Sequence, residues 1–268
     1  MKTKRIGFLK GIISAVFMIA LVVTVFAVMP LTASATNVSN TVYTSNLVEN
    51  DELVLTGDTT LFVNADLTLK SISGDYTLEI QGDGEHTLTV NSPNGCAINV
   101  KALQSVKPSQ GTVNLTVKGG SSKYAIYAED DISLSGINLN VSGGAGIRSY
   151  EGNITINGTH VSVVGENGVA IIANGGSISI DSDYLFVQCA GQSGEAEWEH
   201  GIGAFGNITI NSADATITGL RGVYSQAGNI TLSGNVDVGG VRCALWVCCG
   251  VSVSDRTEAG TLFLSGNS

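Results

Sequence analysis

Apolar and polar residues alternate along most of the second half of the chain, in short runs separated by turns that contain glycine. The clearest runs share the pattern Gly-Ile/Val-x-Ser/Ala, a short turn, and then Asn-Ile-Thr-Ile/Leu. Clear copies span residues 146–156, 201–210 and 222–232, and looser copies span residues 125–134, 170–180 and 243–253. A period of a little over twenty residues, built from strand patterns and tight turns, indicates a solenoid.

The first apolar residue of each Ile-Thr-Ile run marks the period. It falls at Ile132, Ile154, Ile178, Ile208, Ile230 and Val251, with spacings of 22, 24, 30, 22 and 21 residues. Because successive residues of a strand point to opposite sides, Ile154 and Ile156 share one face and Thr155 lies on the other. The alternation returns in Leu139/Val141 and its equivalents, so each repeat offers about three short strands with one apolar side.

One repeat cannot bury its apolar side alone, but stacked repeats can, with successive strands pairing about 4.8 Å apart around one continuous interior. The sequence therefore predicts an all-β fold, a single-stranded, right-handed parallel β-helix. The outward residues of the Ile-Thr-Ile runs are Ser or Thr, which are ordinary at exposed strand positions. Ice-binding faces usually carry two threonines per strand, so a single hydroxyl per coil disfavours that function.

Residues 1–35 have the layout of a secretory signal peptide. A basic start is followed by an apolar run over residues 12–28, and the small residues 33–35 offer a cleavage site. The apolar run is long for a signal, so a retained membrane anchor is the alternative. We expect export to a secreted or extracellular location, with cell-surface association left open and membrane contact only through the signal peptide.

The rest of the chain is acidic and rich in glycine. Residues 1–35 carry four positive charges and no negative ones, so without them the formal charge changes from −10 to −14. Such a chain is not steered to nucleic acid or anionic lipid, although it could attract Ca²⁺. Charged residues make up only 13%, while glycines number 34, which favours short strands and tight turns over amphipathic helices.

The domain organisation follows from the regularity of the repeats. We expect a monomer in which residues 36–120 form an N-terminal cap and the first irregular coils, and residues 121–268 form regular coils. Trp246 aligns with small inward residues of earlier coils, namely Ala128, Ser149, Ala173, Ala204 and Ser225. A bulky ring at that position predicts a C-terminal cap near Trp246 that covers the open end of the interior.

Asparagines recur just before the Ile-Thr-Ile strands. Asn153, Asn207 and Asn229 each follow a glycine. Gly and Asn tolerate left-handed backbone geometry, and Asn side chains bond to local backbone at turns or from coil to coil. These residues are therefore predicted to form a structural ladder and not a ligand site.

The order of the motifs resembles a known group of proteins. The block Tyr76-Thr-Leu-Glu-Ile-Gln-Gly-Asp-Gly, followed by Thr87-Leu-Thr-Val and Ala97-Ile-Asn-Val, leads into the Gly-Ile and Asn-Ile-Thr-Ile repeats. Over about residues 53–265 the chain resembles the repetitive secreted parallel β-helix proteins of anaerobic Gram-positive bacteria, of the type labelled carbohydrate-binding domain-containing. The resemblance implies carbohydrate binding, and in some relatives binding of pectic polysaccharide with Ca²⁺. The acidic Asp-Gly-Ile-Lys-Ser-Asp repeat of the Ca²⁺-dependent members is missing here.

One flank of the predicted solenoid concentrates aromatic residues. At outward positions of the Gly-Ile strands the repeats carry Tyr127, Arg148, Tyr150, Phe205 and Tyr224. Aromatic faces with polar neighbours suit flat sugar rings, which present C–H groups to the π-surface. The alternative is that Tyr and Phe simply favour half-exposed strands. We take these five residues as candidate carbohydrate-binding residues.

One coil is about eight residues longer than its neighbours, and the extra stretch covers about residues 191–200. In it Glu195, Glu197 and Glu199 alternate around Trp198, and loops that project from a rigid scaffold often carry function. Trp198 could stack on a sugar, and the three glutamates could hold Ca²⁺ through hard oxygen ligands. The alternative is a solvated acidic loop.

Catalysis has little support in the sequence. Asp130-Asp131 and His200-Gly201 are similar to polygalacturonase motifs, but they lie about three coils apart. Glycosidases need carboxylates at a defined separation, and fold alone does not give function. The leading hypothesis is a secreted or cell-surface protein that binds polysaccharide without altering it. The alternatives are a structural or adhesive surface protein without a small ligand and, less favoured, a polysaccharide lyase or hydrolase.

Overall fold

The computed structural model describes residues 35–105, 112–191, 199–247, 250–254 and 262–266, and these residues form a β-solenoid of about nine turns. The only helix among them is a single 3-10 turn, η1 (Thr44–Asn46). The strands are β1 (Ala35–Tyr43), β2 (Glu52–Val63), β3 (Leu67–Leu69), β4 (Ser71–Gly82), β5 (Thr87–Asn91), β6 (Ile98–Ser105), β7 (Val113–Lys118), β8 (Tyr124–Ala128), β9 (Ile132–Gly143), β10 (Ala145–Ser149), β11 (Ile154–Gly165), β12 (Ile171–Ala173), β13 (Ile178–Cys189), β14 (His200–Ala204), β15 (Ile208–Ser225), β16 (Asn229–Val247), β17 (Gly250–Ser254) and β18 (Leu262–Gly266).

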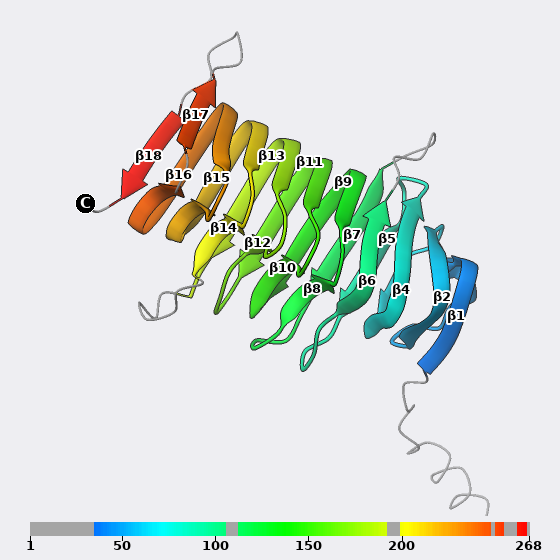
Figure 1. The fold of residues 1–268 in the computed structure, drawn as a ribbon. Coiled ribbons are helices and arrows are strands. Elements are labelled where there is room, and N and C mark those ends of the chain that lie inside the picture. The colour runs from blue at the N-terminus through cyan, green and yellow to red at the C-terminus, as the bar shows by residue number, and fades with distance from the viewer. Residues whose placement is uncertain (1–34, 106–111, 192–198, 248–249, 255–261, 267–268) are drawn as a thin grey trace, which may run out of the picture. The chain divides into compact units, whose positions relative to one another are not determined.

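Every strand pairing in this described part of the chain is parallel, and the strands pair with their equivalents in neighbouring coils. The coils stack in chain order, from the blue β1 at one end to the red β18 at the other (Figure 1). The predicted all-β parallel solenoid is confirmed. Residues 1–34, which hold nearly all of the predicted signal peptide, lie outside the described residues.

The pairings define three faces that run along the stack. The Gly-Ile face contains β8, β10, β12, β14 and the last parts of β15 and β16. The Ile-Thr-Ile face contains the first parts of β9, β11, β13, β15 and β16. The third face contains β3, β5, β7 and the second parts of β9, β11 and β13.

The predicted register of the Ile-Thr-Ile runs is confirmed residue by residue. Ile154 pairs with Ile132 on one side and with Ile178 on the other, and the series continues through Ile208, Ile230 and Val251. Along β11 the burial alternates as the strand period requires, with Ile154 and Ile156 buried and Thr155 exposed. The inward residues of the three faces form one continuous core from Val38 to Val238. Each fully buried Leu, Ile or Val contributes roughly 1.5–3 kcal/mol of transfer free energy.

The asparagine ladder is also present and joins consecutive coils. The backbone N–H of Asn153 donates to Asp131 Oδ1 at 2.7 Å, and Asn153 Oδ1 accepts from the backbone N–H of Ser177 at 2.9 Å. The same bond recurs from Asn207 N to Ser177 Oγ at 3.0 Å and from Asn229 N to Asn207 Oδ1 at 2.8 Å. Each side chain therefore binds the turn of the next coil.

The explanation predicted for the adjacent glycines is wrong. Gly152, Gly206 and Gly228 are not among the residues with positive φ in the described chain. They are required because the coils approach closely. A Cβ on Gly228 would lie 2.3 Å from the carbonyl carbon of Gly206, and one on Gly152 would lie 2.5 Å from that of Asp130.

The predicted inward position of Trp246 is wrong as well. Trp246 pairs with the outward residue Tyr224 and is 46% exposed, while Val247 takes the inward position next to Ser225. The cause is a register shift between β15 and β16. Gly219 pairs with Gly240, but Arg221 pairs with Cys243, so β16 has one extra residue there. Such a bulge moves every following side chain to the opposite side of the strand.

Candidate functional site

The outer surface of the Gly-Ile face carries large side chains in three columns that run from coil to coil. The central column reads Tyr127, Arg148, Ile172, Gly203, Tyr224 and Trp246 in consecutive coils. A second column, two residues further along each strand, reads Glu129, Tyr150, Asn174, Phe205 and Gln226. A third, before the strand centre, includes Tyr124, Ala145, His200, Arg221 and Cys243. We call this surface the aromatic strip.

The first part of the strip is built around Arg148. Its guanidinium carbon lies 5.1 Å from the ring centre of Tyr124, 5.9 Å from that of Tyr127 and 5.2 Å from that of Tyr150. Arg148 Nη1 also donates to Tyr124 Oη at 3.1 Å. Cations within about 6 Å of a ring centre are attracted by the ring quadrupole, so the three rings hold the arginine in place. We call these four residues the Arg148 cluster.

The outer side of the Arg148 cluster is open to solvent. Tyr150 is 45% exposed, so one ring is available for stacking. Tyr127 Oη donates to Glu129 Oε2 at 2.9 Å. Burial, followed by this hydrogen bond, raises the pKa of Tyr127, so the phenol stays protonated and remains a donor near neutral pH. The cluster thus presents a fixed cation, an exposed ring and polar groups side by side.

The second part of the strip is built around Arg221, and we call it the Arg221 cluster. The Arg221 guanidinium carbon lies 5.5 Å from the ring centre of Tyr224 and 4.8 Å from that of Trp246. The His200 ring stacks on Tyr224, with ring centres 4.6 Å apart and planes inclined by 23°. Trp246, which the sequence placed inside the solenoid, is therefore an exposed aromatic side chain of the candidate site.

His200 is enclosed within this cluster. Only 1% of it is exposed, and burial, followed by the positive charge of Arg221, lowers its pKa to about 4. The imidazole is therefore neutral at neutral pH. A small pocket of about 40 Å³ lies beside it, and its lining includes Ile172, Asn174, Gly203 and Phe205. Ile172 belongs to the central outward column but is only 5% exposed.

The structure brings together most of the predicted site residues. Tyr127, Arg148 and Tyr150 form one cluster, and Phe205 and Tyr224 lie on the same face within the next three coils. Besides Trp246, sequence reasoning missed Tyr124, His200 and Arg221 of the strip. Their signal was the register itself, since His200 pairs directly with Arg221 in the next coil.

Only the ends of the acidic loop belong to the described residues. Trp198, Glu195 and Glu197 lie outside the described residues. Glu199 is described and is 2% exposed, so the alternative of a solvated acidic loop does not hold for this residue. Its carbonyl oxygen accepts hydrogen bonds from the backbone N–H groups of Leu220 at 2.9 Å and Arg221 at 3.3 Å. Within the described ranges no group of three or more His, Cys, Asp or Glu side chains is placed to hold a metal ion.

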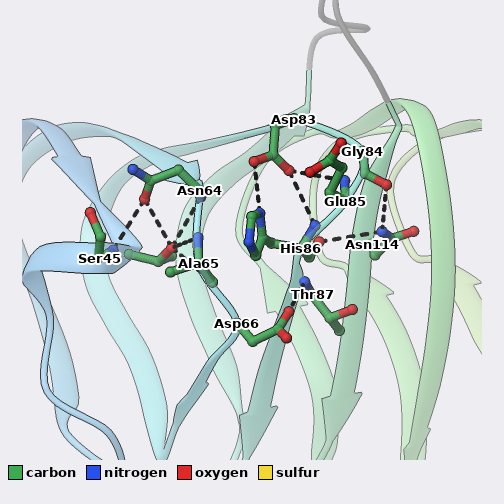
Figure 2. A network of polar contacts seen from close by, with 11 residues as sticks. Ser45, Asn64, Ala65, Asp66, Asp83, Gly84, Glu85, His86, Thr87 and Asn114 are labelled. Carbon is green, nitrogen blue, oxygen red and sulfur yellow. Dashed lines mark hydrogen bonds and ion pairs between the residues drawn. The ribbon is translucent and has the colours of Figure 1, made fainter.

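A polar network occupies the turns of the first coils (Figure 2). Asp83 accepts hydrogen bonds from the backbone N–H groups of Glu85 at 3.0 Å and His86 at 3.1 Å, and its Oδ2 lies 2.7 Å from His86 Nδ1. The bond from Glu85 is the main cause that lowers the pKa of Asp83, and Asp83 in turn raises the pKa of His86. These bonds fix the turn between β4 and β5, so we assign the network to structure.

A larger hollow of about 480 Å³ lies near this network, between η1 and the first coils. Its described lining consists mainly of hydroxyl and aliphatic side chains with two carboxylates, Glu49 and Asp66, and no aromatic ring. Asp66 Oδ1 already accepts the backbone N–H of Thr87 at 2.8 Å (Figure 2). Because it offers neither a stacking surface nor a cation, this hollow is a weaker candidate than the aromatic strip.

The fold and the strip define the class of this protein, a parallel β-solenoid with an aromatic outer face. No protein-family model, no curated protein and no solved structure matches the chain. The resemblance to secreted β-helix proteins of anaerobic bacteria therefore rests on the sequence motifs alone. Among the described residues there is no helix of the length and apolar character needed to cross a membrane.

Proposed function

We propose that the protein binds polysaccharide without altering it and that the aromatic strip is the binding surface. The observation that carries this proposal is the Arg148 cluster, in which three tyrosines and an arginine from two consecutive coils form one fixed surface. Tyrosine and arginine are the residue types that dominate binding energy in recognition surfaces. Their mutual stacking reduces the conformational entropy that a ligand must remove.

The spacing of the exposed rings suits an extended ligand. Tyr150 and Phe205, 45% and 47% exposed, lie in the same column two coils apart, which is about 10 Å, with Asn174 between them. Two stacking platforms separated by an amide can contact successive units of a chain and leave a polar group for hydroxyls. A rigid solenoid keeps that spacing fixed, because each coil is bonded to the next.

Non-catalytic binding is favoured over hydrolysis or lysis by the arrangement of charges. Beside the Arg148 cluster the carboxylate of Glu129 is engaged as the acceptor of a hydrogen bond from Tyr127. A glycosidase needs two carboxylates that face each other across the scissile bond. Secretion, which the signal-like start predicts, would bring such a surface to extracellular glycans.

The test is binding of the purified chain to a panel of plant and mucin polysaccharides, with Ca²⁺ and with a chelator. We expect saturable binding to one class, and about a tenfold loss of affinity for Tyr150→Ala or Tyr224→Ala, as expected for removal of a stacked ring. Tyr184→Ala is the matched control. Tyr184 is 38% exposed and stacks on His160, but it lies on the third face.

Three outcomes would contradict the proposal or its site. A folded chain that binds no polysaccharide would favour the structural or adhesive alternative. Equal losses for Tyr184→Ala and Tyr150→Ala would show that binding is not confined to the strip. Release of reducing ends or unsaturated products from a bound glycan would show an enzyme. Loss of binding with chelator would instead direct attention to the acidic loop around Glu195 and Glu197.

A further inference from the structure

The small pocket of the aromatic strip exists because one position lacks a side chain. Gly203 occupies the central column between Ile172 and Tyr224, where the neighbouring coils carry large residues. Phe205 and His200 lie beside the gap, and the pocket encloses about 40 Å³. A water molecule takes up about 30 Å³ in the liquid, so the pocket can admit a hydroxyl or hydroxymethyl group but not a sugar ring.

Two polar atoms of the residues that line this pocket have no partner. Asn174 Oδ1 and His200 Nδ1 are both buried, and neither has a hydrogen-bond partner in the described structure. Buried polar atoms in folded proteins are nearly always paired, and exceptions call for a ligand, a water or a functional role. Asn174 and His200 come from neighbouring coils and both line this pocket, so one bound group could supply the missing hydrogen bonds of both side chains.

The chemistry of these atoms restricts what that group can be. An amide oxygen accepts hydrogen bonds and cannot donate, so its partner must be a donor. A neutral imidazole nitrogen donates or accepts according to its tautomer, and a hydroxyl can pair with either tautomer because it both donates and accepts hydrogen bonds. A carboxylate could not donate to Asn174. The described lining of the pocket itself contains no Lys, Arg, Asp or Glu side chain, although Arg221 packs against Tyr224 beside it.

We propose that this pocket, formed by Ile172, Asn174, His200, Gly203, Phe205 and Tyr224, is a subsite that receives a hydroxyl or hydroxymethyl group of a neutral hexose. The sugar ring then stacks on Phe205, which is 47% exposed beside the opening. This inference rests on the proposed function, because it names the glycan class that the strip selects. It favours neutral polysaccharides over polymers of uronic acids.

The first test fills the pocket without removing any aromatic ring. In Gly203→Ala the new Cβ would lie 3.1 Å from His200 Cδ2, a close contact with a side chain, and φ of Gly203 is compatible with alanine. We expect about a tenfold loss of affinity for neutral polysaccharide. Gly57→Ala is the matched control, since its Cβ would lie 3.1 Å from Ser39 Cβ in the first coils. It should bind like the unchanged chain.

A second variant separates binding from folding. Asn174→Leu keeps the size of the side chain and removes the unpartnered oxygen, so stability should not fall, whereas affinity for neutral polysaccharide should fall about tenfold. A loss of stability with unchanged affinity would show a structural role for Asn174 and overturn the subsite.

The third measurement observes His200 directly. The chain has three histidines, so imidazole resonances can be followed by NMR while methyl glucoside or galacturonate is added to the chain. We expect the His200 signals to shift with methyl glucoside and not with galacturonate. A response to galacturonate alone would overturn the neutral-hexose assignment.

The failures of the two proposals can be told apart. The subsite would be contradicted, and the binding surface retained, by one pattern of results. In that pattern polysaccharide binding depends on Tyr150 but is unaffected by Gly203→Ala, and the His200 signals do not shift. No polysaccharide binding and no response to either sugar would remove both proposals.

Discussion

The Ile-Thr-Ile face and the Gly-Ile face belong to the same coils and share one core, yet their outer rows differ. On the Ile-Thr-Ile face the row reads Ser133, Thr155, Ser179, Thr209 and Thr231, one small hydroxyl per coil. On the Gly-Ile face the corresponding row reads Tyr127, Arg148, Ile172, Gly203 and Tyr224. Stacking requires the inward residues to repeat and places little demand on the outward ones. Departures from the repeat therefore mark the face where the sequence serves something other than the stack.

The corner before the Ile-Thr-Ile strands shows the opposite behaviour, because there the repeat is a requirement of folding. Gly228 and its equivalents lie where consecutive coils touch through their backbones. In Gly228→Ala the added Cβ would lie 2.3 Å from the carbonyl carbon of Gly206. Backbone must move to relieve that contact, so we expect a loss of roughly 3 kcal/mol in the free energy of unfolding.

Denaturant unfolding measures this loss, and Gly57→Ala serves again as the control, with an expected loss of less than about 1 kcal/mol. A Gly228→Ala protein as stable as the unchanged chain would show that the backbone at the corner can move apart at little cost in free energy. The contrast between a fixed corner and a variable strip would then disappear.

Within the strip, His200 is expected to make the free energy of unfolding depend on pH by a comparable amount. Its pKa of about 4 in the folded protein lies below the usual value of 6.5, so protonation favours the unfolded state. The free energy of unfolding is therefore not reduced by His200 above about pH 6.5, where the imidazole is neutral in both states. It falls as the pH drops from 6.5 toward 4. The full loss in the free energy of unfolding is roughly 3 kcal/mol, since one pKa unit corresponds to about 1.4 kcal/mol.

His86 changes in the opposite direction, because its pKa is raised by Asp83, so its stabilisation is present at low pH and is lost as the pH rises through its folded pKa. The measurement is therefore the difference between the unchanged chain and His200→Phe, which keeps a ring against Tyr224. Unfolding curves from pH 7 to pH 4 should show a smaller acid loss for the variant. Identical pH profiles would place His200 in contact with solvent.

The fold could be predicted from the sequence because burial repeats with the period of a coil. The inward series through Ile154 and Ile178 needed no knowledge beyond strand alternation. Trp246 is an exception to this regularity, because a bulge of one residue in β16 reverses the side chains that follow it in that strand and has no signature in the alternation. The glycines before the Asn residues were identified correctly, but the contact that requires them depends on the distance between coils.

The site was predictable to a smaller extent. Tyr127, Arg148 and Tyr150 were found because they occupy outward positions of the Gly-Ile strands in adjacent repeats, and the structure joins them through the arginine. His200 was missed although the register of the coils aligns it with Arg221 in the next coil. The unpartnered atoms of Asn174 and His200 could not be foreseen, since burial of single atoms depends on how neighbouring side chains pack.

A smaller effect on stability is expected in the asparagine ladder, where a second substitution at the same position should restore the hydrogen bond. Asn207 Oδ1 accepts the backbone N–H of Asn229 in the next coil at 2.8 Å. Asn207→Ala removes this acceptor, so we expect a loss of about 1 kcal/mol in stability. Asn207→Asp keeps an acceptor at the same place and should recover most of the loss by thermal or denaturant unfolding. Equal losses in both variants would mean that the amide makes another contribution.

The smallest effect is expected on the hydroxyl row. Thr155 is exposed between Ser133 and Ser179, and surface substitutions of this kind usually change stability by less than about 0.5 kcal/mol. Thr155→Ala should therefore unfold like the unchanged chain and bind polysaccharide with the same affinity, whereas Arg148→Ala should weaken binding because it removes the group that holds three rings. If Thr155→Ala weakened binding as much as Arg148→Ala, the glycan would contact both faces. Regularity of the outer row could then no longer be used to tell a structural face from a binding face.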